Sequence, residues 1–346
     1  MIAACTRKKE WTGPKFSGRL LVVSQLETHS DLIEITPGPN STYNQTVIVS
    51  GVWQAVASPD QTLLLYTTMD GIFLRDLSKG TVKQLAPGVE GGNNCLAWSP
   101  DSKRFSFRSD ESSHPAARTH LYVSDLDGKK KLIWESWVGG EGLDCDVFWI
   151  APDRLIFDRF LGADPFYEKV GKLELPNTTT LAILGDPVKF VDSDRKWSID
   201  GVCQFGNVAV LTPREKAYPI LIAKNLDDLK TLNPSQVCSP CHFAGFAAKS
   251  CVPFFLEGDN RTSELFSLNT INWQRQRATH LNQDFGSSKM LINSSARLLI
   301  VEDISATLVL VDTESGDSMP FFPKTAGSRG TSGQLQHPIP IAWIEN

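Results

Sequence analysis

The strongest candidate for cofactor chemistry in this chain is a short run of cysteine and histidine. Cys238 and Cys241 are separated by two residues, and His242 follows at once. At this spacing two thiols can add to the vinyl groups of haem c while the histidine ligates iron. Haem also requires an apolar pocket and a second ligand or an open site, which the short flanking strands do not suggest. The sequence therefore favours a loop disulfide, with Cys251 as an alternative partner, or two free thiols, and predicts no cofactor.

A second candidate for chemistry lies at the N-terminus. Ile2-Ala3-Ala4-Cys5 resembles the lipobox of bacterial lipoproteins, in which the cysteine carries lipid. The charged and apolar segments that precede a lipobox are missing, so a start placed too late and a chance match remain as alternatives. On the first alternative Cys5 is a lipid anchor and residues 1–17 are a tether or signal remnant. The protein would then be periplasmic or exposed at the cell surface, which suits the even number of its other cysteines.

Hydrolytic and metal chemistry have little support. The chain has no Gly-x-Ser-x-Gly sequence, so the nucleophile elbow of α/β-hydrolases is missing. Asp192, Asp194 and Asp200 lack the glycine and glutamate of an EF-hand loop, and a solvated acidic turn explains them equally well. The sequence favours a protein that is not an enzyme and predicts no metal site.

Composition narrows the class of protein. The 346 residues carry a net charge of −5, which disfavours a nucleic-acid partner. No apolar run is long enough to span a membrane. The 25 glycines and 20 prolines fall between short Val, Leu, Ile and Phe runs, a pattern typical of an all-β protein.

An internal repeat organises those short strands. Ser58-Pro59-Asp60, Ser99-Pro100-Asp101 and Ala151-Pro152-Asp153 each follow one apolar strand and precede another. Proline presets the backbone for a turn and aspartate bonds its own backbone, so each segment predicts a tight connection between antiparallel strands.

A second hairpin follows each of these connections. Its first strand recurs at intervals of 43 to 51 residues, for example at 72–76, 121–125, 170–174 and 308–312. A period of this length built from four strands is typical of a propeller blade.

The strand count predicts how the ring closes. Seven outer hairpins are present, but the first, beginning near residue 19, has no inner strand before it. Residues 339–343 repeat the inner-strand pattern at the C-terminus, so we expect them to supply that strand and remove an exposed sheet edge. The predicted fold is a single all-β, seven-bladed β-propeller over residues 18–346.

The repeats resemble a known family. The Ser-Pro-Asp turns, with Tyr122-Val123-Ser124-Asp125-Leu126-Asp127-Gly128 after them, resemble the WD-like repeats of TolB-type propellers, most clearly over residues 50–160. The resemblance implies a propeller that lies outside the cytoplasm and binds other proteins. Because these motifs specify turns, they carry the fold and not an activity.

The predicted connections are longest in the third and fourth blades, over residues 110–119, 134–146 and 158–169. Connections at alternate positions of a blade leave at the same face, so we expect these segments to lie together and to bind a partner. The candidate partner-binding residues are His114, Arg118, Trp137, Glu141, Asp144, Asp146, Arg159, Phe166 and Tyr167.

Two functions follow from this arrangement. The first is a non-catalytic scaffold that contacts a protein through the long loops. The second is a propeller enzyme or small-ligand binder with a site at the mouth of the central channel, formed by Asp144, Asp146, Lys196, Asp200 and His242. Convergent charges in the channel would favour the second function, and a plugged apolar mouth would favour the first.

Overall fold

The computed structural model describes most of the chain. The described residues are 15–25, 30–39, 43–88, 93–111, 118–136, 141–161, 178–193, 197–203, 208–213, 220–224, 235–238, 241–247, 250–259, 262–269, 271–272, 274–281, 290–293, 295–302, 308–320 and 337–345. Cys5, His114, Trp137, Phe166, Tyr167 and Lys196 lie outside these ranges.

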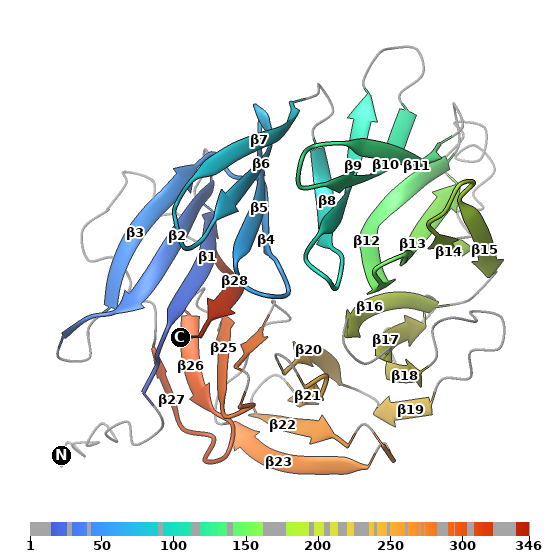
Figure 1. Ribbon diagram of the computed structural model, residues 1–346. Coiled ribbons are helices and arrows are strands. Elements are labelled where there is room, and N and C mark those ends of the chain that lie inside the picture. Colours follow the sequence, from blue (N-terminus) through green and yellow to red (C-terminus); the bar gives the residue numbers. More distant parts are fainter. Residues whose placement is uncertain are drawn as a thin grey trace, which may run out of the picture.

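Seven four-stranded antiparallel sheets form a ring, which confirms the predicted seven-bladed β-propeller (Figure 1). From the innermost strand outward, the first three blades are β28(His337–Ile344), β1(Arg19–Gln25), β2(Ser30–Pro37), β3(Tyr43–Ser50); β4(Gln54–Ala57), β5(Leu63–Thr68), β6(Gly71–Asp76), β7(Val82–Pro87); and β8(Asn93–Trp98), β9(Arg104–Glu111), β10(Arg118–Asp125), β11(Lys130–Glu135).

The other four blades follow the same order. They are β12(Glu141–Ala151), β13(Arg154–Leu161), β14(Thr178–Ile183), β15(Lys189–Ser193); β16(Trp197–Cys203), β17(Val208–Pro213), β18(Ile220–Lys224), β19(Ser235–Cys238); β20(His242–Phe246), β21(Pro253–Asp259), β22(Thr262–Leu268), β23(Arg275–Leu281); and β24(Leu291–Ile292), β25(Leu298–Glu302), β26(Leu308–Asp312), β27(Ser318–Pro320).

The two ends of the chain close the ring, as the strand count predicts. β28 pairs antiparallel with β1, with Leu20 opposite Trp343. Gly18, just before β1, has a positive φ, which glycine adopts without strain. A Cβ at this position would also collide with the carbonyl oxygen of Ile344, so only glycine fits where β1 and β28 meet. Phe16, in the segment expected to be a tether, is buried and its ring lies 5.2 Å from that of Trp343 between centroids.

The Ser-Pro-Asp turns join innermost strands to second strands. The Ser58 hydroxyl donates to the Asp60 carboxylate at 2.6 Å and accepts the Leu63 N–H at 2.9 Å. Ser99 repeats these bonds with Asp101 and Arg104. Burial alone would raise the pKa of Asp60, but the hydrogen bonds from Ser58 and Thr62 outweigh it and lower that pKa.

Apolar side chains fill the spaces between neighbouring blades. One cluster joins Trp98, Phe105 and Phe107 of blade 3 to Leu65 and Ile72 of blade 2. These strands alternate their side chains between two sheet faces, and each face is covered by the next blade, which explains the dense apolar pattern of the inner strands.

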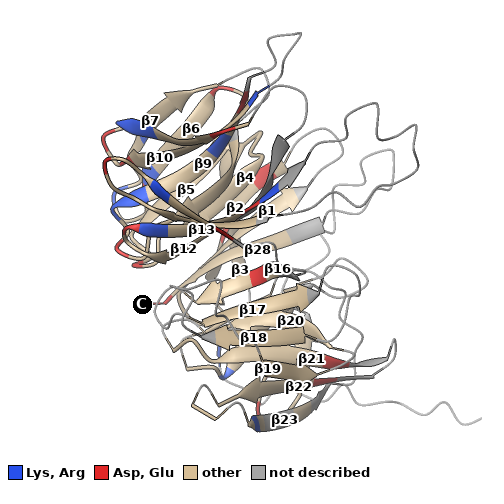
Figure 2. Cartoon of the chain, turned by 90° about the vertical axis from the view of Figure 1, so that its right-hand side faces the viewer, with Lys and Arg blue, Asp and Glu red and all other residues tan. Residues whose placement is uncertain are grey.

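Lysine side chains also connect neighbouring blades at one end of the ring, where Figure 2 colours several Lys and Arg positions of blades 2 to 4 blue. Lys83 Nζ of blade 2 donates to the Leu126 carbonyl of blade 3 at 3.0 Å. Lys131 Nζ of blade 3 donates to the Gly185 carbonyl of blade 4 at 2.6 Å. We call this end, where the Ser-Pro-Asp turns lie, the turn face.

Blade 4 departs from the sequence prediction. The third strand that the structure describes is β14 at Thr178–Ile183. Residues 170–174, which the repeat spacing predicts for this strand, lie outside the described residues. The β-branched run Thr178-Thr179-Thr180 was the overlooked strand signal.

Candidate functional site

The candidate site lies at the end of blades 3 and 4 where β9, β11 and β13 finish and β10, β12 and β14 begin. We call this end the long-loop face. Each of these connections runs either from a second to a third strand or from an outermost strand to the next blade, so all three leave on the same side of the ring. The described strand ends that flank the three predicted segments therefore lie on one side of the ring, while residues 112–117, 137–140 and 162–177 are outside the described part of the chain.

Parts of the predicted loops are strands. Asp110 and Glu111 belong to β9, Arg118 to β10, and Arg159 to β13. Glu141, Asp144 and Asp146 lie on β12, although their side chains are outside the described set. Glu141 pairs with Leu161 and Leu143 with Arg159, so β12 and β13 extend as a hairpin toward the long-loop face.

A polar network holds the base of the blade 3 hairpin. Arg118 of β10 forms an ion pair with Glu135 of β11. Thr119 Oγ1 donates to Asp110 Oδ1 of β9 at 2.8 Å, and the Thr119 N–H donates to Ser136 Oγ at 2.8 Å. The hydrogen bond from Arg118 lowers the pKa of Glu135, which keeps this carboxylate ionised at neutral pH.

His120 lies beneath this ion pair. It is buried, its Nε2 lies 3.5 Å from Glu135 Oε1, and its ring is tilted against Tyr122 at a centroid distance of 5.8 Å. His120 Nδ1 has no hydrogen-bond partner among the described residues. His120 therefore contacts the same Glu135 carboxylate that pairs with Arg118.

A second network holds the base of the blade 4 hairpin. Arg159 Nε donates to Thr180 Oγ1 at 2.8 Å, and its Nη2 lies 2.7 Å from Asp192 Oδ1 of β15. Asp158, which is 3% exposed, accepts a hydrogen bond from Thr179 Oγ1 at 2.6 Å. These bonds link the middle and outer strands just below the long connection.

The two predicted arginines thus differ in their environment. The Arg118 side chain is 47% exposed, so it can contact a partner while paired with Glu135. Arg159 is more enclosed and is used to brace its own blade. Sequence reasoning did not pair Glu135, Asp158 and Asp192 with Arg118, Thr179 and Arg159, because these pairs depend on which residues face each other across strands. Spacing along the chain does not reveal that register.

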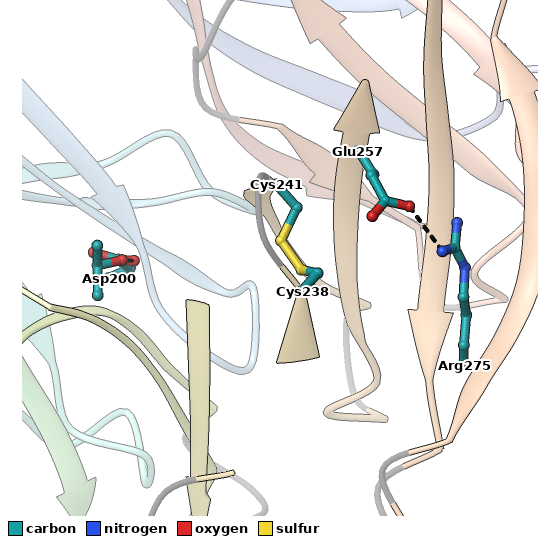
Figure 3. Close-up of a disulfide and its surroundings, with 6 residues drawn as sticks. Asp200, Cys238, Cys241, Glu257 and Arg275 are labelled. Carbon is teal, nitrogen blue, oxygen red and sulfur yellow. Dashed lines mark hydrogen bonds and ion pairs between the residues drawn. A yellow bond between two sulfur atoms is a disulfide. The ribbon is translucent and has the colours of Figure 1, made fainter. Parts of the chain in front are cut away.

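The Cys-x-x-Cys-His segment forms a disulfide in the structure (Figure 3). Cys238 at the end of β19 is bonded to Cys241 just before β20, so the bond spans the junction between blades 5 and 6. Cys251, the alternative partner, is bonded to Cys203 of β16. In this state neither Cys238 nor Cys241 has a thiol available for haem, and His242 is an exposed residue at the start of β20.

The central channel contains a cavity of about 290 Å³. Innermost strands of five blades surround it, and the lining is apolar: Val56, Ala57, Leu96, Ala97, Trp98, Val147, Phe148, Trp149, Val202 and Ile341. Apolar walls of this kind provide little for recognising a charged ligand.

Asp200 lies on β16, two residues before the cavity residue Val202. The Asp200 side chain is exposed to solvent, but the surrounding protein partly desolvates it and raises its pKa. A hydrogen bond from Thr212 Oγ1 acts in the opposite direction and is the weaker effect. Of the other channel candidates, His242 is an exposed residue on β20, and Asp144 and Asp146 lie on β12.

A second cavity, of about 350 Å³, lies on the turn face between blades 3 and 4. Arg104, Lys129 and Lys131 line it over an apolar floor that includes Ile133 and Leu184. Lys131 and Arg104 donate hydrogen bonds to backbone carbonyls of blade 4. These two cations therefore stabilise the contact between blades 3 and 4.

Among the described residues, no group of three or more His, Cys, Asp or Glu side chains is arranged to hold a metal ion. The described part of the chain also includes no helix of the length and apolarity needed to cross a membrane.

Comparisons with known proteins show similarity in structure only. No family model matches the chain, and no curated protein matches it in sequence. An oligogalacturonate lyase in complex with manganese superposes with a TM-score of 0.59 at 11% identity, over 89% of this chain and 86% of that one. The uncharacterized protein lmo1340 of Listeria monocytogenes EGD-e gives 0.56 at 9% identity, over 92% and 100%.

A prolyl endopeptidase gives a TM-score of 0.56 at 13% identity, over 89% of this chain but 49% of that one. The chain therefore spans about half the length of that peptidase. At identities this low the likeness carries the architecture and no activity. By fold, the chain is a seven-bladed β-propeller similar to those of lyases and peptidases.

Proposed function

We propose that this propeller is a non-catalytic module that binds a protein partner through the long-loop face of blades 3 and 4. The observation that carries the proposal is the pair of braced hairpins. Ion pairs Arg118–Glu135 and Arg159–Asp192 stabilise the bases of two neighbouring long connections on one side of the ring. Rigid supports beneath long connections reduce the entropy lost when a partner binds.

The residue types at this face support the same proposal. Trp137, Phe166 and Tyr167 are aromatic and Arg118 is exposed, and aromatic residues and arginine dominate the binding energy of protein interfaces. His114, Glu141, Asp144 and Asp146 would form the polar rim. The apolar cavity of the central channel also fits a scaffold better than a binder of polar ligands.

We place this activity outside the cytoplasm, as in TolB-type propellers, which the turn motifs resemble. Two disulfides between blades 5 and 6 support this location, because such bonds persist in oxidising compartments. A lipid on Cys5 would hold the propeller at a membrane surface. Mass spectrometry of the protein extracted from native membranes tests this part, since a diacylated Cys5 adds a mass that a soluble chain lacks.

Alanine variants test the binding surface. Trp137→Ala/Tyr167→Ala should reduce recovery of a stoichiometric partner from native extract by at least about tenfold while leaving the melting temperature unchanged. The matched control is Lys79→Ala/Lys103→Ala, at exposed residues on the turn face. Equal recovery by the wild type and the first variant, or equal loss with the control, would reject the proposal.

A second function is favoured by one observation, the raised pKa of Asp200 beside the channel. Acids with shifted pKa values gather at functional sites, and enzymes are among the structural neighbours. This alternative predicts that Mn²⁺ alone or an oligogalacturonate binds, and that Asp200→Asn abolishes the heat of binding. Calorimetry showing no heat with either probe would leave the scaffold function in place.

A further inference from the structure

The groove between blades 3 and 4 on the turn face combines cationic side chains with an apolar floor. Its volume of about 350 Å³ lies within the range of small-ligand sites. Val123 and Ile133 of blade 3 and Leu184 of blade 4 form the floor, and the first two are buried. An apolar group that covers this floor would be removed from water, which favours binding.

Two of the three cations in the groove are held in place by the protein. Arg104 donates to the Pro152 carbonyl, and its guanidinium carbon lies 5.7 Å from the centre of the Trp149 ring. Lys131 Nζ donates to the Gly185 carbonyl at 2.6 Å. A guanidinium has five N–H donors and an ammonium has three, so both groups retain donors after making these bonds. Arg104 and Lys131 can therefore join the blades and still bind an anion.

Lys129 is the third cation, in the turn between β10 and β11. Its backbone N–H donates to the Asp125 carboxylate at 2.9 Å, which fixes the position of the residue in the turn. The residue is exposed, and among the described residues none forms a hydrogen bond or ion pair with its ammonium group. The charge of Lys129 is therefore available to a ligand in the groove.

The balance of charges around the groove discriminates between anions. Asp125 and Asp186 also line it, so the three cations face two carboxylates and leave one positive charge in excess. The Asp125 carboxylate accepts the N–H groups of Asp127 and Lys129 and so is already used within its own turn. A monoanion matches the excess charge, whereas a dianionic phosphate would bring a second negative charge close to two carboxylates.

We propose that this groove binds a small carboxylate that carries an apolar group. The ligand carboxylate accepts hydrogen bonds from Lys129 and from the remaining donors of Arg104 and Lys131, and its apolar group covers the floor. Hydrogen bonds between such cations and a carboxylate are about twice as strong as those between neutral groups. A fatty acid and the C-terminal residue of a peptide share this chemistry, and two different probes distinguish them.

Isothermal titration calorimetry of the full chain at low salt and neutral pH tests the proposal. Hexanoate represents the fatty acid and N-acetyl-L-leucine the peptide C-terminus, and at least one of them should bind with a Kd of about 1 mM or lower. 1-Hexanol lacks the charge and inorganic phosphate lacks the apolar group, so each should bind at least about tenfold more weakly. No binding of either carboxylate, or equally strong binding of 1-hexanol or phosphate, would overturn the proposal.

Charge reversal tests the location of the site. Lys129→Glu gives the groove an excess negative charge and should weaken binding of the carboxylate probe at least about tenfold. The matched control is Lys79→Glu, at an exposed lysine in the corresponding turn of blade 2, outside the groove. It changes the net charge of the chain by the same amount and should alter the Kd by less than about twofold, because water and salt screen distant exposed charges.

Melting curves establish that both variants are folded, and both substitutions are at exposed side chains. Unchanged binding by Lys129→Glu, or an equal loss with Lys79→Glu, would overturn the proposal. The second result would mean that the probe responds to the net charge of the chain and not to this groove.

Discussion

The indole nitrogen of Trp149 donates a hydrogen bond to the carbonyl oxygen of Ala97 at 3.2 Å, from the innermost strand of blade 4 to that of blade 3. Trp98 makes the same contact one blade earlier, with Val56 at 3.0 Å. Trp149 Nε1 also lies 3.1 Å from Ser106 Oγ. Trp98 and Trp149 therefore link the innermost strands of neighbouring blades.

Replacement of Trp149 by phenylalanine tests this link. The substitution keeps an aromatic ring in the core but removes the N–H, so the Ala97 carbonyl and the Ser106 hydroxyl lose a donor. We expect the free energy of unfolding to fall by about 1 to 3 kcal/mol, measured by urea denaturation. Trp53→Phe is the control, because Trp53 is 52% exposed and should change stability little. Equal losses from both variants would contradict the role of the indole link.

Glycine substitutions test how the ring closes. Gly18 and Gly51 both have positive φ, but a Cβ at Gly18 meets the Ile344 carbonyl, whereas a Cβ at Gly51 has no atom within 4 Å. Gly51→Ala should therefore cost about 1 to 2 kcal/mol of strain. Gly18→Ala should cost clearly more, because β28 must also shift away from β1. Melting temperatures measure the difference, and equal effects would mean that the seam tolerates a methyl group.

The Ser58–Asp60 turn predicts a pH dependence. The pKa of Asp60 is lowered in the folded state, so its contribution to stability is present above the unfolded-state pKa of about 3.9 and is lost as pH falls toward the folded-state pKa. Ser58→Ala should cost about 1 kcal/mol at pH 7. The difference from wild type should shrink, though not vanish, at pH 3.

Urea unfolding at several pH values measures that trend. Ser267→Ala is a suitable control, because the buried Ser267 hydroxyl donates to the Gln276 carbonyl and not to a carboxylate. Its effect should be the same at pH 7 and pH 3. A Ser58→Ala effect that is equally constant would show that Asp60 is not the hydrogen-bonded partner.

The two disulfides that join blades 5 and 6 should differ in their contribution to stability. Cys203 and Cys251 are 48 residues apart and Cys238 and Cys241 are 3 apart, so the first bond removes more entropy from the unfolded chain. Chain-entropy arguments give about 4 kcal/mol for the first and about 2 kcal/mol for the second. Calorimetry of the double alanine variants should show the larger fall in melting temperature for Cys203→Ala/Cys251→Ala. The reverse order would contradict this assignment.

Much of the fold could be predicted from sequence because it depends on local chemistry. The Ser-Pro-Asp turns mark three connections, and the unmatched first hairpin identifies the C-terminal closing strand. Blade 4 shows the limit, because a fixed repeat length did not locate β14, whose first residue, Thr178, is far along the sequence from the end of β13 at Leu161. Contacts such as Arg159–Asp192 and Cys203–Cys251 depend on three-dimensional register, which a single sequence does not contain.

Site-specific photo-cross-linking tests the central claim, that a partner binds the long-loop face, most directly. A photoreactive phenylalanine analogue at position 167 should give a covalent adduct with one partner in native extract, and the same analogue at position 103 on the turn face should give none. Trp137→Ala in the position 167 protein should reduce the adduct. A strong adduct at position 103 with none at position 167 would contradict binding through the long loops of blades 3 and 4.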